Sequence, residues 1–130
     1  MRIVHGLPPN FDQIAAVFPA ARQPGVIFTY GLIIYLSRGA KITQPLVRHE
    51  AVHGMRQAED PAAWWDRYLI DPGFRLEEEL VAHRVEWQAY VKRHGFRESM
   101  LDMIAGRLSG PLYGGMLSYA EARDAIVRLK

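Results

Sequence analysis

The sequence contains no cysteine among its 130 residues. A disulfide framework is therefore excluded, and because thiolates are absent, any bound metal must be held by His, Asp or Glu. Long apolar runs are lacking as well. The best one, residues 26–36, is interrupted by Thr29 and Gly31 and is far shorter than the roughly 20 residues of a membrane-spanning helix. With no signal-like apolar run at the N-terminus, we expect a cytoplasmic protein with no membrane partner.

An excess of charge of one sign is also missing. The formal net charge is only +2, which is too small to indicate nucleic-acid binding by itself. Hydrophobic residues make up 49% of the chain and charged residues 23%, which is typical of a folded globular protein. The length suits one hydrophobic core, so we expect a single domain that spans residues 1–130.

One stretch carries a chemical motif, His49-Glu50-Ala51-Val52-His53, inside a mostly apolar segment that is typical of a helix. Residues four apart on a helix differ by about 40° and lie one turn apart, so His49 and His53 can direct their imidazoles at one point. Glu50 lies roughly 100° further round the helix and can reach a water bound at that point. Two imidazoles and a nearby carboxylate are the ligands and the base that a hydrolytic zinc site requires.

Turn residues divide the rest of the chain into short elements. Two segments rich in β-branched and aromatic residues, 26–30 and 33–37, predict an antiparallel pair of strands. Capping residues, prolines and apolar periodicity predict helices over residues 11–18, 44–58, 62–70, 74–91 and 97–108, and a last one from Ser118 to about Lys130. We therefore expect a mostly helical α+β domain, with a small β-sheet or hairpin beside the helix that carries the histidine motif.

The helix that follows Pro72 combines a buried stripe with consecutive glutamates. The stripe is formed by Leu76, Leu80, His83, Trp87, Tyr90 and Val91. At about 100° per residue, Glu79 lies roughly 70° from the centre of the stripe, whereas Glu78 points almost directly away. Glu77 and Glu86 lie near its margins. Glu79 is therefore the acid best placed to face inward. The alternative, that Glu77 to Glu79 form a solvent-exposed acidic run, fits Glu78 well and Glu79 poorly.

A second pattern, Glu79-Leu80-Val81-Ala82-His83, follows the first by 26 residues, counted from His53. The pair of motifs resembles the gluzincin zinc metallopeptidases, in which a His-Glu-x-x-His helix is followed by a second helix with Glu-x-x-Ala. The resemblance covers roughly residues 26–91. It is to the short, minimal members of the group, some of which are found in phage and bacterial genomes.

This resemblance implies a zincin-like fold in which His49, His53 and Glu79 hold Zn²⁺ and Glu50 is the general base. The sequence departs from the family at one position, because gluzincins often have Asp four residues after the third ligand and this chain has His83. Three roles are open to a neutral His83. It would accept a hydrogen bond from a ligand histidine, or donate one to a reaction intermediate, or be a core histidine whose hydrogen bonds are all made within the protein.

Hydrolysis of an amide also needs a donor for the oxyanion that develops on the carbonyl. Tyr113, in a loop flanked by glycines, is the first candidate for this catalytic role, and His83 is the second. The other role open to Tyr113 is that of a plain loop anchor. Gln57 lies one turn past His53, and we expect it at a solvated helix end rather than beside a ligand.

The leading hypothesis is a zinc-dependent metallopeptidase that hydrolyses an amide bond in a peptide or protein substrate. A zinc-stabilised binding or structural protein without turnover is the alternative from another class. The hypothesis that ranks last is a nucleic-acid-associated protease or binder. It is motivated by four arginines: Arg97, Arg107, Arg123 and Arg128. The sequence identifies neither the substrate nor the oligomeric state.

Overall fold

The computed structural model describes residues 1–128. The strands are β1 (Arg2–His5), β2 (Ile27–Tyr30) and β3 (Ile33–Leu36). The α-helices are α1 (Phe11–Val17), α2 (Gln44–Gln57), α3 (Pro61–Ile70), α4 (Pro72–His94), α5 (Glu98–Leu108) and α6 (Tyr119–Val127), and the 3-10 helices are η1 (Pro19–Arg22) and η2 (Pro111–Tyr113). The prediction of a mostly helical α+β fold is confirmed. Within the described range, every helix is either too short or too polar to traverse a lipid bilayer.

The sheet has the strand order β1-β3-β2. Strands β2 and β3 form the predicted antiparallel pair, with Phe28 opposite Tyr35. Gly31 in their connection has φ 63°, a conformation that favours glycine. Strand β1 pairs in parallel with β3 and places Ile3 opposite Ile34. The sequence did not predict β1, because a parallel pair joins distant segments and has no local turn signal.

The helices begin largely where their caps predict. Asp60 and Asp71 cap α3 and α4, and each carboxylate accepts a hydrogen bond from the backbone N–H three residues further on. Thr43 occupies the N-cap of α2, but its side chain makes no capping hydrogen bond. A capping box at Ser118 starts α6, which ends at Val127; the predicted end near residue 130 lies outside the described residues.

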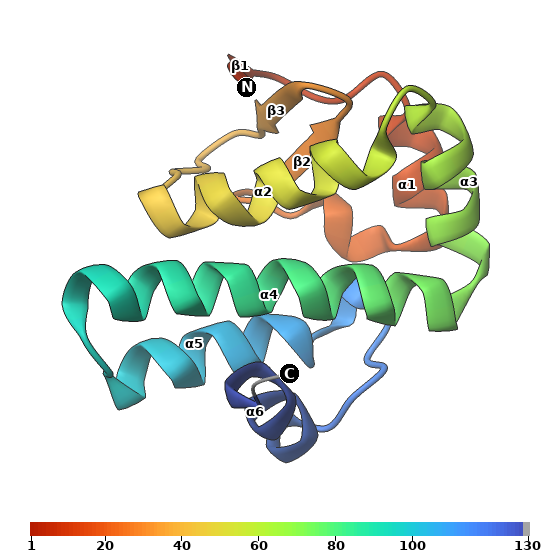
Figure 1. Ribbon diagram of the computed structural model, residues 1–130. Coiled ribbons are helices and arrows are strands. Elements are labelled where there is room, and N and C mark those ends of the chain that lie inside the picture. The colour runs from red at the N-terminus through yellow and green to blue at the C-terminus, as the bar shows by residue number, and fades with distance from the viewer. Residues whose placement is uncertain (129–130) are drawn as a thin grey trace.

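Helix α4 runs through the middle of the molecule (Figure 1). Helix α2 lies between the sheet and α4, while α5 and α6 cover the other side of α4. One apolar cluster lies on the side of the sheet, α1 and α3, and a second lies among α4, α5 and α6. Between these clusters, α2 and α4 bury seven histidine and glutamate side chains: His49, Glu50, His53, Glu78, Glu79, His83 and Glu86.

The prediction that Glu78 faces solvent is wrong. Its side chain is 2% exposed and accepts hydrogen bonds from Arg56 and from the indole N–H of Trp64. Leu76 and Leu80, which were expected in the buried stripe, are only half-buried. A single stripe underestimates the buried surface of α4, because α2 and α3 cover one side of this helix and α5 and α6 cover another.

Gln57 is likewise buried rather than solvated. Its amide nitrogen donates to the carbonyl oxygen of Thr29 at 2.9 Å, and its amide oxygen accepts from the N–H of Gly31 at 2.6 Å. The end of α2 is therefore fastened to the β2–β3 hairpin. This hairpin contact, which helical periodicity does not report, is the reason for the error.

Candidate metal centre

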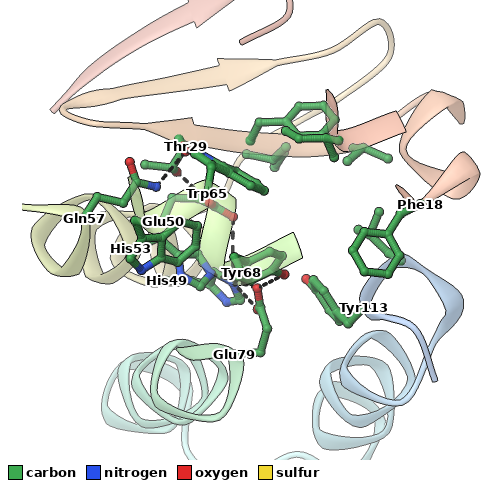
Figure 2. A pocket seen from close by; sticks show the side chains of 16 residues that line it. Phe18, Thr29, His49, Glu50, His53, Gln57, Trp65, Tyr68, Glu79 and Tyr113 are labelled. Carbon is green, nitrogen blue, oxygen red and sulfur yellow. Dashed lines mark hydrogen bonds and ion pairs between the residues drawn. The ribbon is translucent and has the colours of Figure 1, made fainter. Parts of the chain in front are cut away.

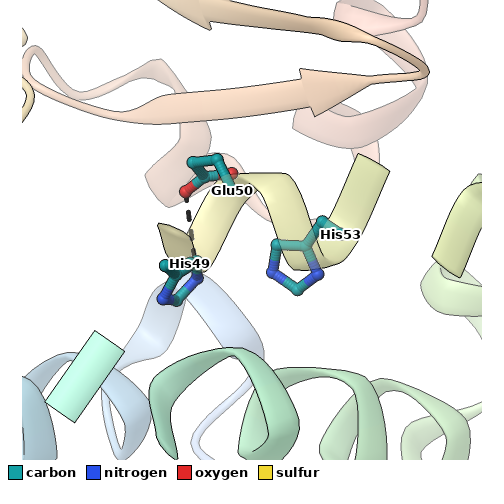
Figure 3. A group of neighbouring side chains, drawn as sticks. All are labelled: His49, Glu50 and His53. Carbon is teal, nitrogen blue, oxygen red and sulfur yellow. Dashed lines mark ion pairs between the residues drawn. The ribbon is translucent and has the colours of Figure 1, made fainter. Parts of the chain in front are cut away.

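Helix α2 turns all three polar groups of its motif into the protein. Figure 3 shows the imidazoles of His49 and His53 on the side of α2 that faces α4, with Glu50 on the side nearer the sheet. The two imidazole centroids are 5.0 Å apart. His49 is 1% exposed, and Glu50 and His53 are 6% exposed. Arg48, which precedes the motif, is exposed.

Glu79 meets the two histidines from α4 (Figure 2). Its Oε2 lies 3.3 Å from Nε2 of His53, and its Oε1 lies 3.7 Å from Nε2 of His49. In a tetrahedral zinc site with bonds near 2.0–2.2 Å, neighbouring ligand atoms are about 3.4 Å apart. Each histidine nitrogen therefore lies at about this distance from one oxygen of the Glu79 carboxylate, Oε2 for His53 and Oε1 for His49. The prediction that Glu79 faces inward is confirmed.

Three buried atoms in this group lack a hydrogen-bond partner within residues 1–128: Oε1 of Glu79, Nδ1 of His53 and Nε2 of His83. A buried carboxylate oxygen without a donor costs free energy. The side chains of His49, Glu50 and His53 offer ligand atoms within 4.8 Å of one another, and so do those of His49, Glu79 and His83. These buried groups can hold a metal ion.

The ion pairs of the buried glutamates also indicate a cation site. Of the buried glutamates on α2 and α4, Glu78 pairs with Arg56 and Glu86 pairs with Arg107. Among the residues described, Glu50 and Glu79 form ion pairs with histidines only. Two buried carboxylates without a permanent cation are costly, and a divalent cation would neutralise both.

Glu86 orients His49, the first of the candidate ligands. Its Oε1 accepts a hydrogen bond from Nδ1 of His49 at 2.9 Å, and its Oε2 accepts one from Arg107 of α5. A proton on Nδ1 leaves the lone pair of His49 on Nε2, the atom that faces Glu79. The sequence placed Glu86 only at the margin of a stripe. In this structure Glu86, not the residue at position 83, contacts Nδ1 of His49.

Two hydroxyl groups hold the carboxylates of the site. Thr29 on β2 donates to Oε1 of Glu50 at 2.7 Å, and Tyr68 on α3 donates to Oε2 of Glu79 at 2.5 Å. The sequence analysis named neither residue for this purpose. The helical pattern around Tyr68 indicates burial, and no feature of strand 26–30 distinguishes Thr29 from a structural residue.

The two candidate oxyanion donors occupy different positions. Tyr113 lines the same cavity as Glu50 and Glu79, and Figure 2 shows its hydroxyl directed toward Glu79. His83 is fully buried, and its Nδ1 donates to the backbone carbonyl of Glu79 at 2.7 Å. Its ring packs edge-on against His49 and Tyr113. The wall of the cavity does not include His83.

Proton affinities in the metal-free site follow from burial and charge. Burial alone lowers the pKa of His53, but Glu79 and Glu50 outweigh burial and raise this pKa to about 9. Burial raises the pKa of Glu79, but the imidazoles, His53 above all, bring this pKa down to about 2. Burial and then the charge of His49 lower the pKa of His83 to about 3, which keeps it neutral. A protonated His53 thus compensates the carboxylate that a metal would otherwise neutralise.

A small cavity adjoins the candidate ligands. It has a volume of about 40 Å³ and is bounded by the site, by Phe18 after α1, and by apolar side chains of α1, β2 and η2, including Ile14, Phe28 and Leu112. This is room for about three water molecules. A water molecule beside Glu50 therefore fits, whereas an extended peptide does not fit in this conformation.

The arginines behind the nucleic-acid alternative are largely paired. Arg107 is directed inward to Glu86, Arg123 pairs with Glu98 and Asp102, and Arg128 pairs with Asp124. Pairing with carboxylates reduces the positive charge that these side chains offer to a phosphate backbone.

Comparison with known proteins supplies no relative for this chain. No protein-family model matches it, and no curated protein or solved structure matches it either. What the site does is therefore inferred from its own geometry and charges.

Proposed function

We propose that the chain is a zinc-dependent metallopeptidase of the gluzincin type, with His49, His53 and Glu79 as its zinc ligands. The observation that carries the proposal is the convergence of two imidazoles and one carboxylate from separate helices, with nitrogen–oxygen separations of 3.3 and 3.7 Å. Three protein ligands in a tetrahedral site leave the fourth position for water. That open position distinguishes a catalytic zinc site from a structural one.

The ligand types favour zinc over the common hard cations. Calcium and magnesium take six or more oxygen ligands and rarely use imidazole. A site with two histidines and one glutamate, without cysteine, is a set that catalytic zinc uses. When bound, zinc would supply a Lewis acid for a water molecule and for the scissile carbonyl.

Glu50 is proposed as the general base. Its Oε1 is held by Thr29, and its Oε2 lies 3.8 Å from Nε2 of His49, on the side of the candidate ligands. Glu50 would take a proton from the attacking water and pass it to the leaving amide nitrogen. Tyr113, on the wall of the same cavity, would donate a hydrogen bond to the developing oxyanion.

The test combines metal analysis with a change of the base. The parent protein, supplied with zinc, is expected to bind about one ion per chain and to cleave members of a peptide library. Glu50→Gln should retain the ion, because Glu50 is not a proposed ligand, and should lose at least about 10²-fold in kcat/KM, because the base is removed. Glu77→Gln makes the same chemical change at an exposed position and should keep full activity.

Two results would count against these assignments. Cleavage by Glu50→Gln at the parent rate would show that Glu50 is not the base. A parent protein that binds no zinc and cleaves no peptide would remove the proposal as a whole.

A zinc-stabilised domain without turnover is the second candidate, and the enclosed site favours it. A cavity of about 40 Å³ holds a few waters and no peptide. In that case, removal of zinc lowers the melting temperature of the parent protein, while no member of a peptide library is cleaved.

A further inference from the structure

Tyr68 makes the shortest of the hydrogen bonds to the candidate ligand Glu79. Its hydroxyl, on α3, donates to Oε2 of Glu79 at 2.5 Å (Figure 2). Tyr68 is 5% exposed, so water does not compete for this bond. Hydrogen bonds from a hydroxyl to an ionised carboxylate have this length and are about twice as strong as those between neutral groups.

The ring that carries this hydroxyl has a fixed position. It stacks on Trp64 with ring centroids 4.8 Å apart, and the edge of Trp65 contacts it at 5.1 Å. The backbone carbonyl of Tyr68 accepts a hydrogen bond from Nη1 of Arg75 at 2.7 Å. The donor is therefore held by packing on its ring and by a hydrogen bond on its backbone.

As a result, the two oxygens of Glu79 are not equivalent. Oε2 accepts the phenolic proton, whereas Oε1 has no hydrogen-bond partner within residues 1–128. Oε1 also lies 3.7 Å from Nε2 of His49 and 3.4 Å from Nδ1 of His83. Oε2 faces Nε2 of His53 at 3.3 Å in addition to the Tyr68 hydroxyl, so Oε1 is the oxygen with unused capacity to bind a cation.

We infer that Tyr68 is a positioning residue, which holds Oε2 of Glu79 so that the carboxylate binds the metal through Oε1 alone. The inference rests on the metal-binding part of the proposed function. Its consequence is chemical, because a carboxylate that binds through both oxygens occupies two coordination positions. Binding through one oxygen keeps a position free for water.

The test uses Tyr68→Phe, which removes the hydroxyl and keeps the ring. Loss of such a hydrogen bond to a ligand is expected to raise the dissociation constant for zinc about 10- to 100-fold. With Co²⁺ in place of zinc, the freed carboxylate should bind through both oxygens. The visible absorption of the cobalt should then weaken, since five-coordinate Co²⁺ absorbs less strongly than tetrahedral Co²⁺.

The matched control is Tyr35→Phe, which removes a hydroxyl from a partly buried tyrosine packed on the same apolar cluster, away from the site. It should leave zinc affinity and the cobalt spectrum unchanged. Circular dichroism of the metal-free variants shows whether each is folded. The cobalt spectrum of the parent protein is a second measurement that needs no variant, and it should be that of a tetrahedral site.

The outcomes separate this inference from the proposed function. If the parent binds no zinc or cobalt, the proposed metal centre fails, and the inference fails with it. If the parent binds zinc but Tyr68→Phe keeps its affinity and its cobalt spectrum, only the positioning role is overturned. A five-coordinate cobalt spectrum in the parent would also overturn it.

Discussion

Single side chains next to two of the candidate ligands, His49 and Glu79, determine which atom of each would face a metal. His49 is the clearest case, because Nδ1 donates to Glu86 and only Nε2 remains for coordination. Burial raises the pKa of Glu86, but His49 and Arg107 outweigh burial and lower this pKa to about 2, so the acceptor is ionised. An ionised acceptor makes the imidazole of His49 a better donor of electrons to a metal.

Glu86→Ala is therefore expected to weaken metal binding without removing a ligand. The dissociation constant for zinc should rise about 10- to 100-fold, because the orientation of His49 is lost. The free energy of unfolding should fall by about 1–3 kcal/mol, since Arg107 and Nδ1 of His49 lose a buried partner. Competition with a chelating dye measures the affinity, and urea unfolding measures the stability.

Glu77→Ala, at an exposed position of the same helix, serves as the control for Glu86→Ala. It should change stability by less than about 0.5 kcal/mol and leave zinc affinity as in the parent. Parent-like zinc affinity in Glu86→Ala would contradict the orienting role of Glu86.

The sequence predicts ligand candidates better than it predicts the residues that hold them. His49 and His53 share a helix, so their convergence follows from helical spacing alone. Glu79 could be placed on an inward face by the same argument. Glu86 and Tyr68 act through partners that tertiary packing brings from other elements, and no local pattern reports such contacts.

At the scale of structural elements, α2 approaches the β2–β3 hairpin closely at Gly54. A Cβ atom added there would lie 2.6 Å from the carbonyl oxygen of Gly31 and 3.2 Å from the side chain of Met1. The first of these contacts is to backbone, which cannot move aside easily. Gly54 therefore allows the close approach of α2 to the sheet.

Gly54→Ala should destabilise the fold even though alanine favours helix. Alanine gains about 1 kcal/mol in helix propensity. Overpacking costs about 1–3 kcal/mol and should exceed this gain, given a clash with backbone. We expect a net loss of about 1 kcal/mol or more in the free energy of unfolding of the metal-free protein, measured by urea denaturation.

Gly106 in α5 offers the opposite case, because no atom lies within 4 Å of the Cβ that alanine would add. Gly106→Ala should stabilise the protein by about 0.5–1 kcal/mol through helix propensity. If Gly54→Ala proved as stabilising as Gly106→Ala, the close approach of α2 to the hairpin would be disproved.

Helices are predicted more completely than the sheet. The starts of α3, α4 and α6 follow from Asp60, Asp71 and Ser118, whose capping is local chemistry. The β2–β3 hairpin is also local. Strand β1 depends on pairing with a segment about thirty residues away in the sequence. The buried surface of α4 depends on helices that cover it on two sides. A short stretch of sequence predicts neither of these features.

For the molecule as a whole, the candidate metal centre lies across the α2–α4 interface, between the two apolar clusters. Two of its proposed ligands come from α2 and the third comes from α4. A bound ion would therefore connect the layer next to the sheet with the central helix. Without an ion, histidines are the only ion-pair partners of the buried Glu50 and Glu79 carboxylates within residues 1–128.

Zinc is accordingly expected to stabilise the whole fold. An ion that binds only the folded chain adds about 2.7 kcal/mol when its concentration is 100-fold above the dissociation constant. In a domain of this size, that corresponds to a rise of roughly 10 °C in melting temperature. Scanning calorimetry with zinc and with a chelator measures the shift.

Magnesium should have no such effect, because it prefers six oxygen ligands. Glu79→Ala should abolish the shift, whereas an identical melting temperature of the parent with zinc and with chelator would mean that no ion joins α2 to α4.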